Sequence, residues 1–191
     1  VICEDRLPTD KEPYKNIKID KWQFLDDESV KIIYVSPSKR RLSNLRKLIN
    51  SVEYDLIFIN SFFSPFTTFL FLWLYRFKKI KQLPVIIAPR GELHKGALAS
   101  KSIKKYLYIK LINLSRLMVN FEWLVTDAQE KKDVLNNINN VKEAFICEDI
   151  PQDSINSDSW SHLTSRIKKK SCHVRFVYIS RILEKKGLQD A

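Results

Sequence analysis

Two short basic segments hold all three glycines of the 191-residue chain. One is residues 89–96, PRGELHKG, and the other is residues 181–187, RILEKKG. Glycine tolerates a positive φ and lets a ligand come close to bare backbone. Arginine and lysine side chains bind phosphate and carboxylate groups. The residue types and their spacing therefore predict two loops that handle anionic groups.

The first of these loops follows a short apolar run at residues 84–88, which predicts a buried parallel strand. Open parallel sheets bind ligands at the carboxyl ends of their strands. Arg90 and Glu92 are therefore expected at this edge of the sheet, here called the rim. Arg90 could grip a phosphate or carboxylate through two hydrogen bonds, and Gly91 would let the ligand approach. The alternative is a tight turn in which Arg90 pairs with Glu92.

The second loop follows a predicted strand at residues 174–179 and precedes a helix that starts at Gly187. Arg181 and Lys186 would then lie at a helix N-terminus, where the two cations together would neutralise a diphosphate. The alternative is a surface turn with two ordinary solvated charges. Spacing alone does not decide between these interpretations.

A basic helix is predicted from about residue 101 to residue 118. Its first turn carries Lys101, Lys104 and Lys105, which oppose the helix dipole. These lysines could face an anionic substrate or a membrane, or they could form a solvated helix face. One apolar stripe runs along the same helix: Ile103, Leu107, Leu111, Leu114 and Met118.

Glu130 is predicted to help begin the following helix rather than to act in catalysis. Asp127 has the position of a helix N-cap, and Glu130 has the reciprocal position of a capping box.

Strand and helix patterns alternate along the chain, which predicts a doubly wound, mostly parallel Rossmann-like sheet. The predicted strands lie at residues 1–3, 30–35, 56–59, 84–88, 122–126, 144–147 and 174–179. Residues 1–150 would form a first domain, and residues 151–172, rich in Ser, Asp, Asn and Lys, a linker. Residues 173–191 would begin a second Rossmann-like domain.

Composition restricts the possible partners. The net charge of +11 indicates an anionic partner, which could be nucleic acid, an anionic membrane or a phosphorylated substrate. A hydrophobic content of 45% excludes a disordered chain. The three cysteines and three histidines lack the spacing of a metal site or redox motif, and a reducing cytoplasm is the simplest location.

Residues 56–75 carry no charge and are long enough to cross a bilayer. However, Ser64 followed by Pro65 is typical of a helix start. We therefore expect a strand and then a helix in place of a membrane span.

Several segments, taken in order, resemble family 4 of the retaining glycosyltransferases, of the kind that builds bacterial capsular or O-antigen polysaccharide. They are residues 86–98, Lys101, residues 104–105, residues 126–130 and residues 176–187. The resemblance covers about residues 30–191. It implies the GT-B fold of two Rossmann-like domains, the first binding the acceptor and the second the nucleotide-sugar. The implied activity transfers a sugar from that donor to a lipid-linked or saccharide acceptor.

The resemblance also implies roles for particular residues. Arg181, Lys186 and Gly187 match the loop that holds the donor diphosphate, stabilising the departing nucleotide in place of a metal ion; no metal or other cofactor is expected. Cleft and acceptor-side positions correspond to Arg90, Gly91, Glu92, Lys101, Lys105 and Glu130. The expected location is cytoplasmic, with peripheral attachment at the inner face of the membrane.

Departures from the family leave other interpretations open. The family's first strand with its glycine loop and its later acidic motif are not in the chain, and residues 147–151 differ from the usual Pro-Asn-Gly stretch. We therefore predict that these 191 residues alone do not transfer sugar. One alternative is a basic nucleic-acid-binding module, although its aromatics lie in apolar runs. The other is a non-catalytic remnant whose sheet would expose an edge.

Overall fold

The computed structural model describes residues 1–7, 10–25, 30–99, 102–141 and 143–148. Within this part of the chain, the contacts gather Val1–Cys147 into one compact unit. The predictions for Lys101, Arg181, Lys186 and Gly187, for the linker and for the second domain lie outside the described residues.

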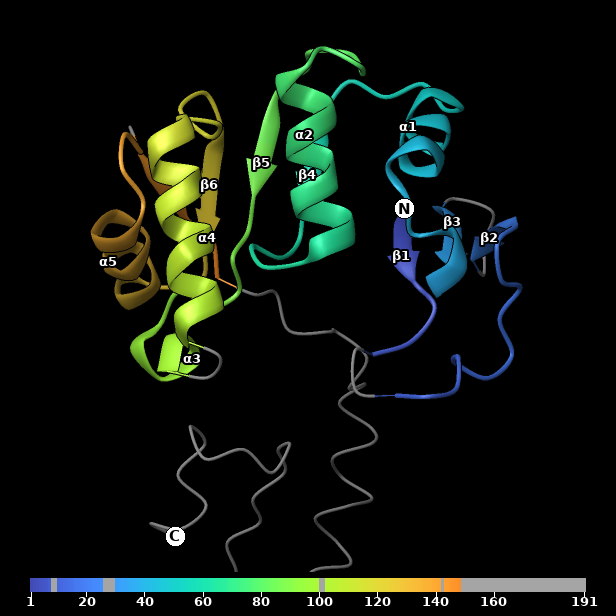
Figure 1. Cartoon of the computed structure of the whole chain (residues 1–191), viewed down its shortest axis with the longest axis horizontal. Helices are drawn as coiled ribbons and strands as arrows, with labels where there is room; N and C mark the ends of the chain where they lie inside the picture. Colours follow the sequence, from blue (N-terminus) through green and yellow to red (C-terminus); the bar gives the residue numbers. More distant parts are fainter. Residues whose placement is uncertain (8–9, 26–29, 100–101, 142, 149–191) are drawn as a thin grey trace, which may run out of the picture. The chain divides into compact units, whose positions relative to one another are not determined.

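A four-stranded parallel sheet is the centre of this unit (Figure 1). Its order is β4 (Ile57–Ile59), β5 (Val85–Ile87), β6 (Glu122–Val125) and β7 (Ala144–Ile146). Each connection between neighbouring strands contains a helix, as parallel pairing requires. The chain therefore has a mixed α/β architecture of the Rossmann-like kind, which confirms the predicted parallel sheet.

A second sheet has the order β1 (Ile2–Glu4), β3 (Val30–Val35) and β2 (Trp22–Leu25). Strand β1 runs parallel to β3, as predicted, but β2 runs antiparallel to it. Strand β2 was not among the predicted strands. This edge strand shows little apolar alternation and forms because β3 offers it a partner along four register pairs.

The helices expected after Ser64, from about residue 101 and after Asp127 are all present, whereas a 3₁₀ turn was not predicted. The helical segments are the 3₁₀ turn Pro37–Lys39, α1 (Leu42–Asn50), the π-helical turn Pro65–Phe69 that leads into α2 (Leu70–Arg76), α3 (Lys95–Ala99), α4 (Ser102–Ser115) and α5 (Ala128–Asn137). The Ser64 hydroxyl accepts a hydrogen bond from the Thr67 amide at 3.1 Å, which confirms the predicted cap. The short α3 was not predicted.

No helix among the described residues is long and apolar enough to cross a membrane. The uncharged stretch 56–75 is divided between β4, a loop and the π-helical turn with α2.

An aromatic cluster fills the space between the four-stranded sheet and its helices. Phe62 and Trp123 are fully buried, with ring centroids 6.0 Å apart. Tyr108 of α4 packs edge-on against Phe62 at 5.3 Å. This packing fixes the loop that follows β4 and sets the start of α4 above it.

Candidate functional site

The loop after β5 turns sharply at Arg90 and Gly91, whose φ angles are +53° and +70°. A left-handed conformation costs an ordinary residue about 1–2 kcal/mol, so the surrounding contacts must hold Arg90 in place. A Cβ added to Gly91 would meet nothing within 4 Å. Glycine is therefore required here for its backbone angle and not for space. Gly96, by contrast, lies inside α3 without a positive φ.

Glu92 joins the β5 loop to the β4 loop. Its carboxylate accepts hydrogen bonds from the amides of Phe62 at 2.6 Å and Phe63 at 3.0 Å, and from the Ser61 hydroxyl at 3.0 Å. The Arg90 Nε donates to the side-chain oxygen of Asn60 at 2.8 Å. The structure thus ties both side chains of the predicted turn to residues 60–63, in place of the Arg90–Glu92 pair that the turn alternative proposed.

Glu130 joins the β5 loop to the β6 loop. Its carboxylate is buried and accepts from the Gly91 amide at 2.5 Å, the Thr126 amide at 2.7 Å and the Thr126 hydroxyl at 2.9 Å. Asp127 accepts from the Glu130 amide at 2.8 Å, which confirms its predicted helix cap. The capping box is modified, because Glu130 reaches back to Thr126 and across to Gly91. The Gly91 amide is consequently occupied by a protein partner.

Lys105 also connects loops. Its Nζ donates to the Ala97 carbonyl and lies 5.1 Å from the centre of the Phe63 ring. The side chain is half-buried, so the alternative of a fully solvated lysine is wrong for this residue. Lys104, on the neighbouring position, is exposed.

Tyr108 lies beneath these loops and was not singled out in the sequence. Its hydroxyl is buried with no hydrogen-bond partner among the described residues. Burial, together with the nearby Glu92 carboxylate, raises the pKa of Tyr108 well above its ordinary value. The phenol therefore stays protonated at physiological pH. In the sequence it is one more aromatic residue of an apolar helix, which is why no signal marked it.

A cavity of about 920 Å³ opens beside the loops. The edge strands β1 and β4 both line it, as do Asn60, Ser61 and Glu92. In the three-stranded sheet β1 is an edge strand next to β3, and in the four-stranded sheet β4 is an edge strand followed by β5, β6 and β7 in sequence order. The cavity thus opens between an edge strand of the three-stranded sheet and an edge strand of the four-stranded sheet.

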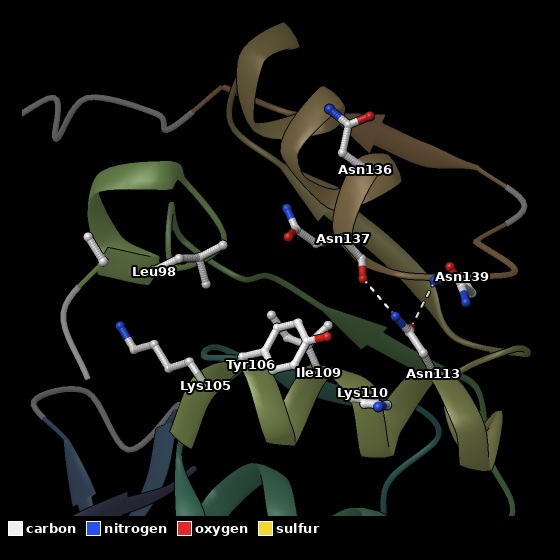
Figure 2. A pocket seen from close by; sticks show the side chains of 10 residues that line it. Leu98, Lys105, Tyr106, Ile109, Lys110, Asn113, Asn136, Asn137 and Asn139 are labelled. Carbon is white, nitrogen blue, oxygen red and sulfur yellow. Dashed lines mark hydrogen bonds between the residues drawn. The ribbon is translucent and has the colours of Figure 1, made fainter. Parts of the chain in front are cut away.

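A second hollow, of about 580 Å³, lies between α3, α4 and α5 (Figure 2). Asn113 crosses it, donating to the Asn137 carbonyl at 2.8 Å and accepting from the Asn139 amide at 2.9 Å. These amides connect α4 to the end of α5. The hollow is therefore explained by helix packing, and it contains none of the rim carboxylates.

The predicted site residues are brought together in part. Arg90, Gly91, Glu92 and Glu130 share one set of hydrogen-bonded loops, and Lys105 contacts Phe63 in the same region. Within the described ranges, no group of three or more His, Cys, Asp or Glu side chains could hold a metal ion.

Comparison with known proteins adds no relative. The chain matches no protein-family model, no curated protein and no solved structure. The function must therefore be argued from the rim loops and from the sequence resemblance.

Proposed function

We propose that this chain belongs to a GT-B glycosyltransferase of family 4 and contributes the acceptor-side domain. In this proposal the enzyme transfers a sugar from a nucleotide-sugar to a lipid-linked or saccharide acceptor of a surface polysaccharide. The observation that carries the proposal is the conformation of Arg90. A left-handed arginine directly after a central parallel strand is an energetic cost, and such costs concentrate at functional sites.

The surrounding contacts support a positioning role for the two carboxylates. Glu92 accepts from two amides and a hydroxyl, and Glu130 accepts from two amides and a hydroxyl as well. Carboxylates so occupied are better suited to holding loops than to taking a proton. Their task would be to hold Arg90 against Asn60, which lines the cavity, so that the guanidinium could bind a phosphate or a sugar hydroxyl of the acceptor.

The donor side of the proposal rests on the sequence. Arg181 and Lys186 would bind the diphosphate of the nucleotide-sugar and stabilise the departing nucleotide electrostatically. The reaction would take place in the cytoplasm at the inner face of the membrane. No metal ion is required in this scheme.

Acceptor binding by the 191-residue chain tests the proposal. The probes are water-soluble saccharide diphosphates with short lipid chains, and the measurement is titration calorimetry. Replacing Arg90 with alanine should weaken binding roughly ten- to a hundredfold, because hydrogen bonds to charged groups contribute about 1.5–3 kcal/mol. Arg46→Ala, at an exposed position on α1, is the matched control and should leave the affinity unchanged.

Two outcomes would count against the proposal: no binding of any such saccharide, or equal losses in the Arg90 and Arg46 variants. A separate assay follows acceptor-dependent consumption of nucleotide-sugars by the chain. We expect none, and turnover would overturn the prediction that these residues alone are inactive.

A further inference from the structure

Helix α4 exposes an apolar stripe to solvent. Ile112 on the packed side is 2% exposed, and Tyr108 is enclosed by aromatic rings. The exposed members of the stripe, with their exposed fractions, are Ile103 (75%), Leu107 (58%), Leu111 (49%) and Leu114 (82%). Met118, the last residue of the predicted stripe, lies beyond the helix and is buried. The helix is thus apolar on both sides, and the part of the chain that the structure describes covers only one of them.

Positive charge accompanies the stripe. Lys104 and Lys110 are exposed on α4, and Arg116 is exposed just after it. No acidic residue occurs between Glu92 and Glu122. The exposed face of α4 therefore combines large apolar side chains with positive charge and no negative charge.

Helix α2 carries a second exposed group of apolar and basic side chains. It lies beside α4 over the four-stranded sheet (Figure 1), and Phe69 at its start contacts Tyr108 with ring centroids 6.1 Å apart. Trp73 and Phe77 follow at steps of four residues, the spacing that places side chains on one side of a helix. They are 48% and 51% exposed, their rings are 4.3 Å apart, and exposed Lys78 comes next.

We propose that the exposed faces of α2 and α4, here called the α2–α4 surface, dock on an anionic lipid bilayer. A helix with apolar and basic side chains on one exposed face lies in the interface plane, with leucines at the acyl boundary and lysines among the phosphates. Tryptophan is enriched at that same level. This inference deepens the proposed function, on which it rests for the location at the membrane, by naming the surface that would meet the lipid.

Charge selects this partner over others. A second copy docking through the same surface would bring Lys104 and Lys110 against identical lysines, with no acidic residue between Glu92 and Glu122 to compensate. A nucleic acid would use the lysines but would leave Leu107 and Leu111 uncovered. An anionic surface with an apolar interior satisfies both kinds of side chain.

Vesicle sedimentation of the full chain tests the proposal, using phosphatidylcholine alone and phosphatidylcholine mixed with phosphatidylglycerol. The chain should partition onto the anionic vesicles and be released by salt. Leu107→Gln with Leu111→Gln should weaken partitioning more than tenfold, because less apolar surface would be buried in the bilayer. Lys104→Gln with Lys110→Gln should also weaken it more than tenfold, at about fivefold per lysine.

A matched control lies on α5. Leu135 is 46% exposed and Lys132 is exposed on the same helix, so Leu135→Gln with Lys132→Gln removes the same chemistry elsewhere and should leave partitioning unchanged. Circular dichroism melts verify that each variant is folded. Equal losses in the α4 and α5 variants, or equal binding to both kinds of vesicle, would overturn the proposal.

Trp73 reports the position of the surface. Brominated phosphatidylglycerol should quench part of the tryptophan fluorescence, and Trp73→Phe should remove most of that quenching while vesicle binding persists. Unchanged quenching in the variant would place the bound face elsewhere.

Self-association that disappears in the Leu107 and Leu111 variant, without lipid binding, would assign the surface to a second copy. Tighter binding to a DNA probe than to anionic vesicles would also contradict the proposal. Acceptor binding by the Arg90 loop is measured without a bilayer, so either proposal can fail alone.

Discussion

The two sheets bind the carboxylates at the ends of their strands in opposite ways. At the end of β1, Glu4 and Asp5 meet guanidinium groups: Arg40 contacts Glu4 at 2.7 Å and Asp5 at 2.8 Å, and Arg6 contacts Asp5 at 2.8 Å. At the ends of the parallel strands β5 and β6, the loop carboxylates accept from backbone amides and hydroxyls.

The difference separates a cluster held by ion pairs from loops held by neutral donors, which are the loops of the proposed acceptor site. In the first region positive and negative charges cancel one another, and Asp5 has no exposed surface. In the second region the amide dipoles satisfy the acids, and the Arg90 Nε bonds to the neutral amide of Asn60. These loops are thus held by backbone and hydroxyl donors, without the two arginines that hold the acids at the end of β1.

Breaking the ionic cluster should have the largest effect. Asp5→Asn leaves Arg6 and Arg40 without a fully buried countercharge, and removing one partner of a buried pair costs about 3–5 kcal/mol. Urea denaturation measures the loss in the free energy of unfolding. Glu53→Gln, at an exposed acid, is the control and should change stability by less than about 0.5 kcal/mol. A similar small change for Asp5→Asn would mean that the cluster contributes little.

The same variant sharpens the comparison through pH. Hydrogen bonds from Arg6, and the charges of Arg6 and Arg40, hold the pKa of Asp5 below its ordinary value. A carboxyl with a lowered folded pKa adds stability that is fully present above its unfolded pKa, about 3.9. That stability is lost as the pH falls from there through the folded pKa. The stability gap between the natural chain and Asp5→Asn should therefore narrow below about pH 4; a gap that is constant down to pH 2 would contradict this account.

Weakening the hydrogen bonds of the loops after β5 and β6 should reduce the stability of the fold by a smaller amount. Glu130→Gln keeps the shape of the side chain but turns one acceptor oxygen into a donor that faces the amides of Gly91 or Thr126. Loss of hydrogen bonds to a charged group should reduce stability by about 1.5–3 kcal/mol. Denaturation measures this loss, and acceptor titration should show weaker binding because the Arg90 loop is released. Lys131→Gln, on the same helix turn, is the control for an altered charge.

The smallest expected effect compares two glycines in one segment. Gly91→Ala places a Cβ at φ +70° and should cost about 1–2 kcal/mol. Gly96→Ala lies within α3, where alanine should be neutral or stabilise by up to about 1 kcal/mol. Thermal melts of the two variants should thus shift in different directions. Equal shifts would show that the backbone angle of Gly91 is not what requires glycine.

Much of the four-stranded sheet could be predicted from local pattern. The apolar runs at β4 and β5 are short, uninterrupted and bounded by turn residues, and β3 has the predicted bounds 30–35. The helix caps at Ser64 and Asp127 were predictable as well, because a cap is a contact between residues three positions apart. Strand β2 was missed, because its stability comes from pairing with β3 and not from its own apolar pattern.

The site was predicted as a set of residues but not as a set of contacts. Glu92 is 31 positions from Ser61, and Glu130 is 39 positions from Gly91. No local rule relates residues that far apart. The stripe on α4 shows the same limit, since its spacing was plain in the sequence but its exposure was not.

The sequence by itself determined the alternation of strands and helices from β3 onward apart from α3, the capping residues, the excess of positive charge and the glycine at the β5 turn. These properties depend on neighbours within a few positions or on composition. The tertiary structure decided which partners the carboxylates take, where the cavity opens between β1 and β4, and which side of α4 remains uncovered. Those properties arise only when distant segments pack, because a hydrogen bond or a buried face depends on distance in space and not on distance along the chain.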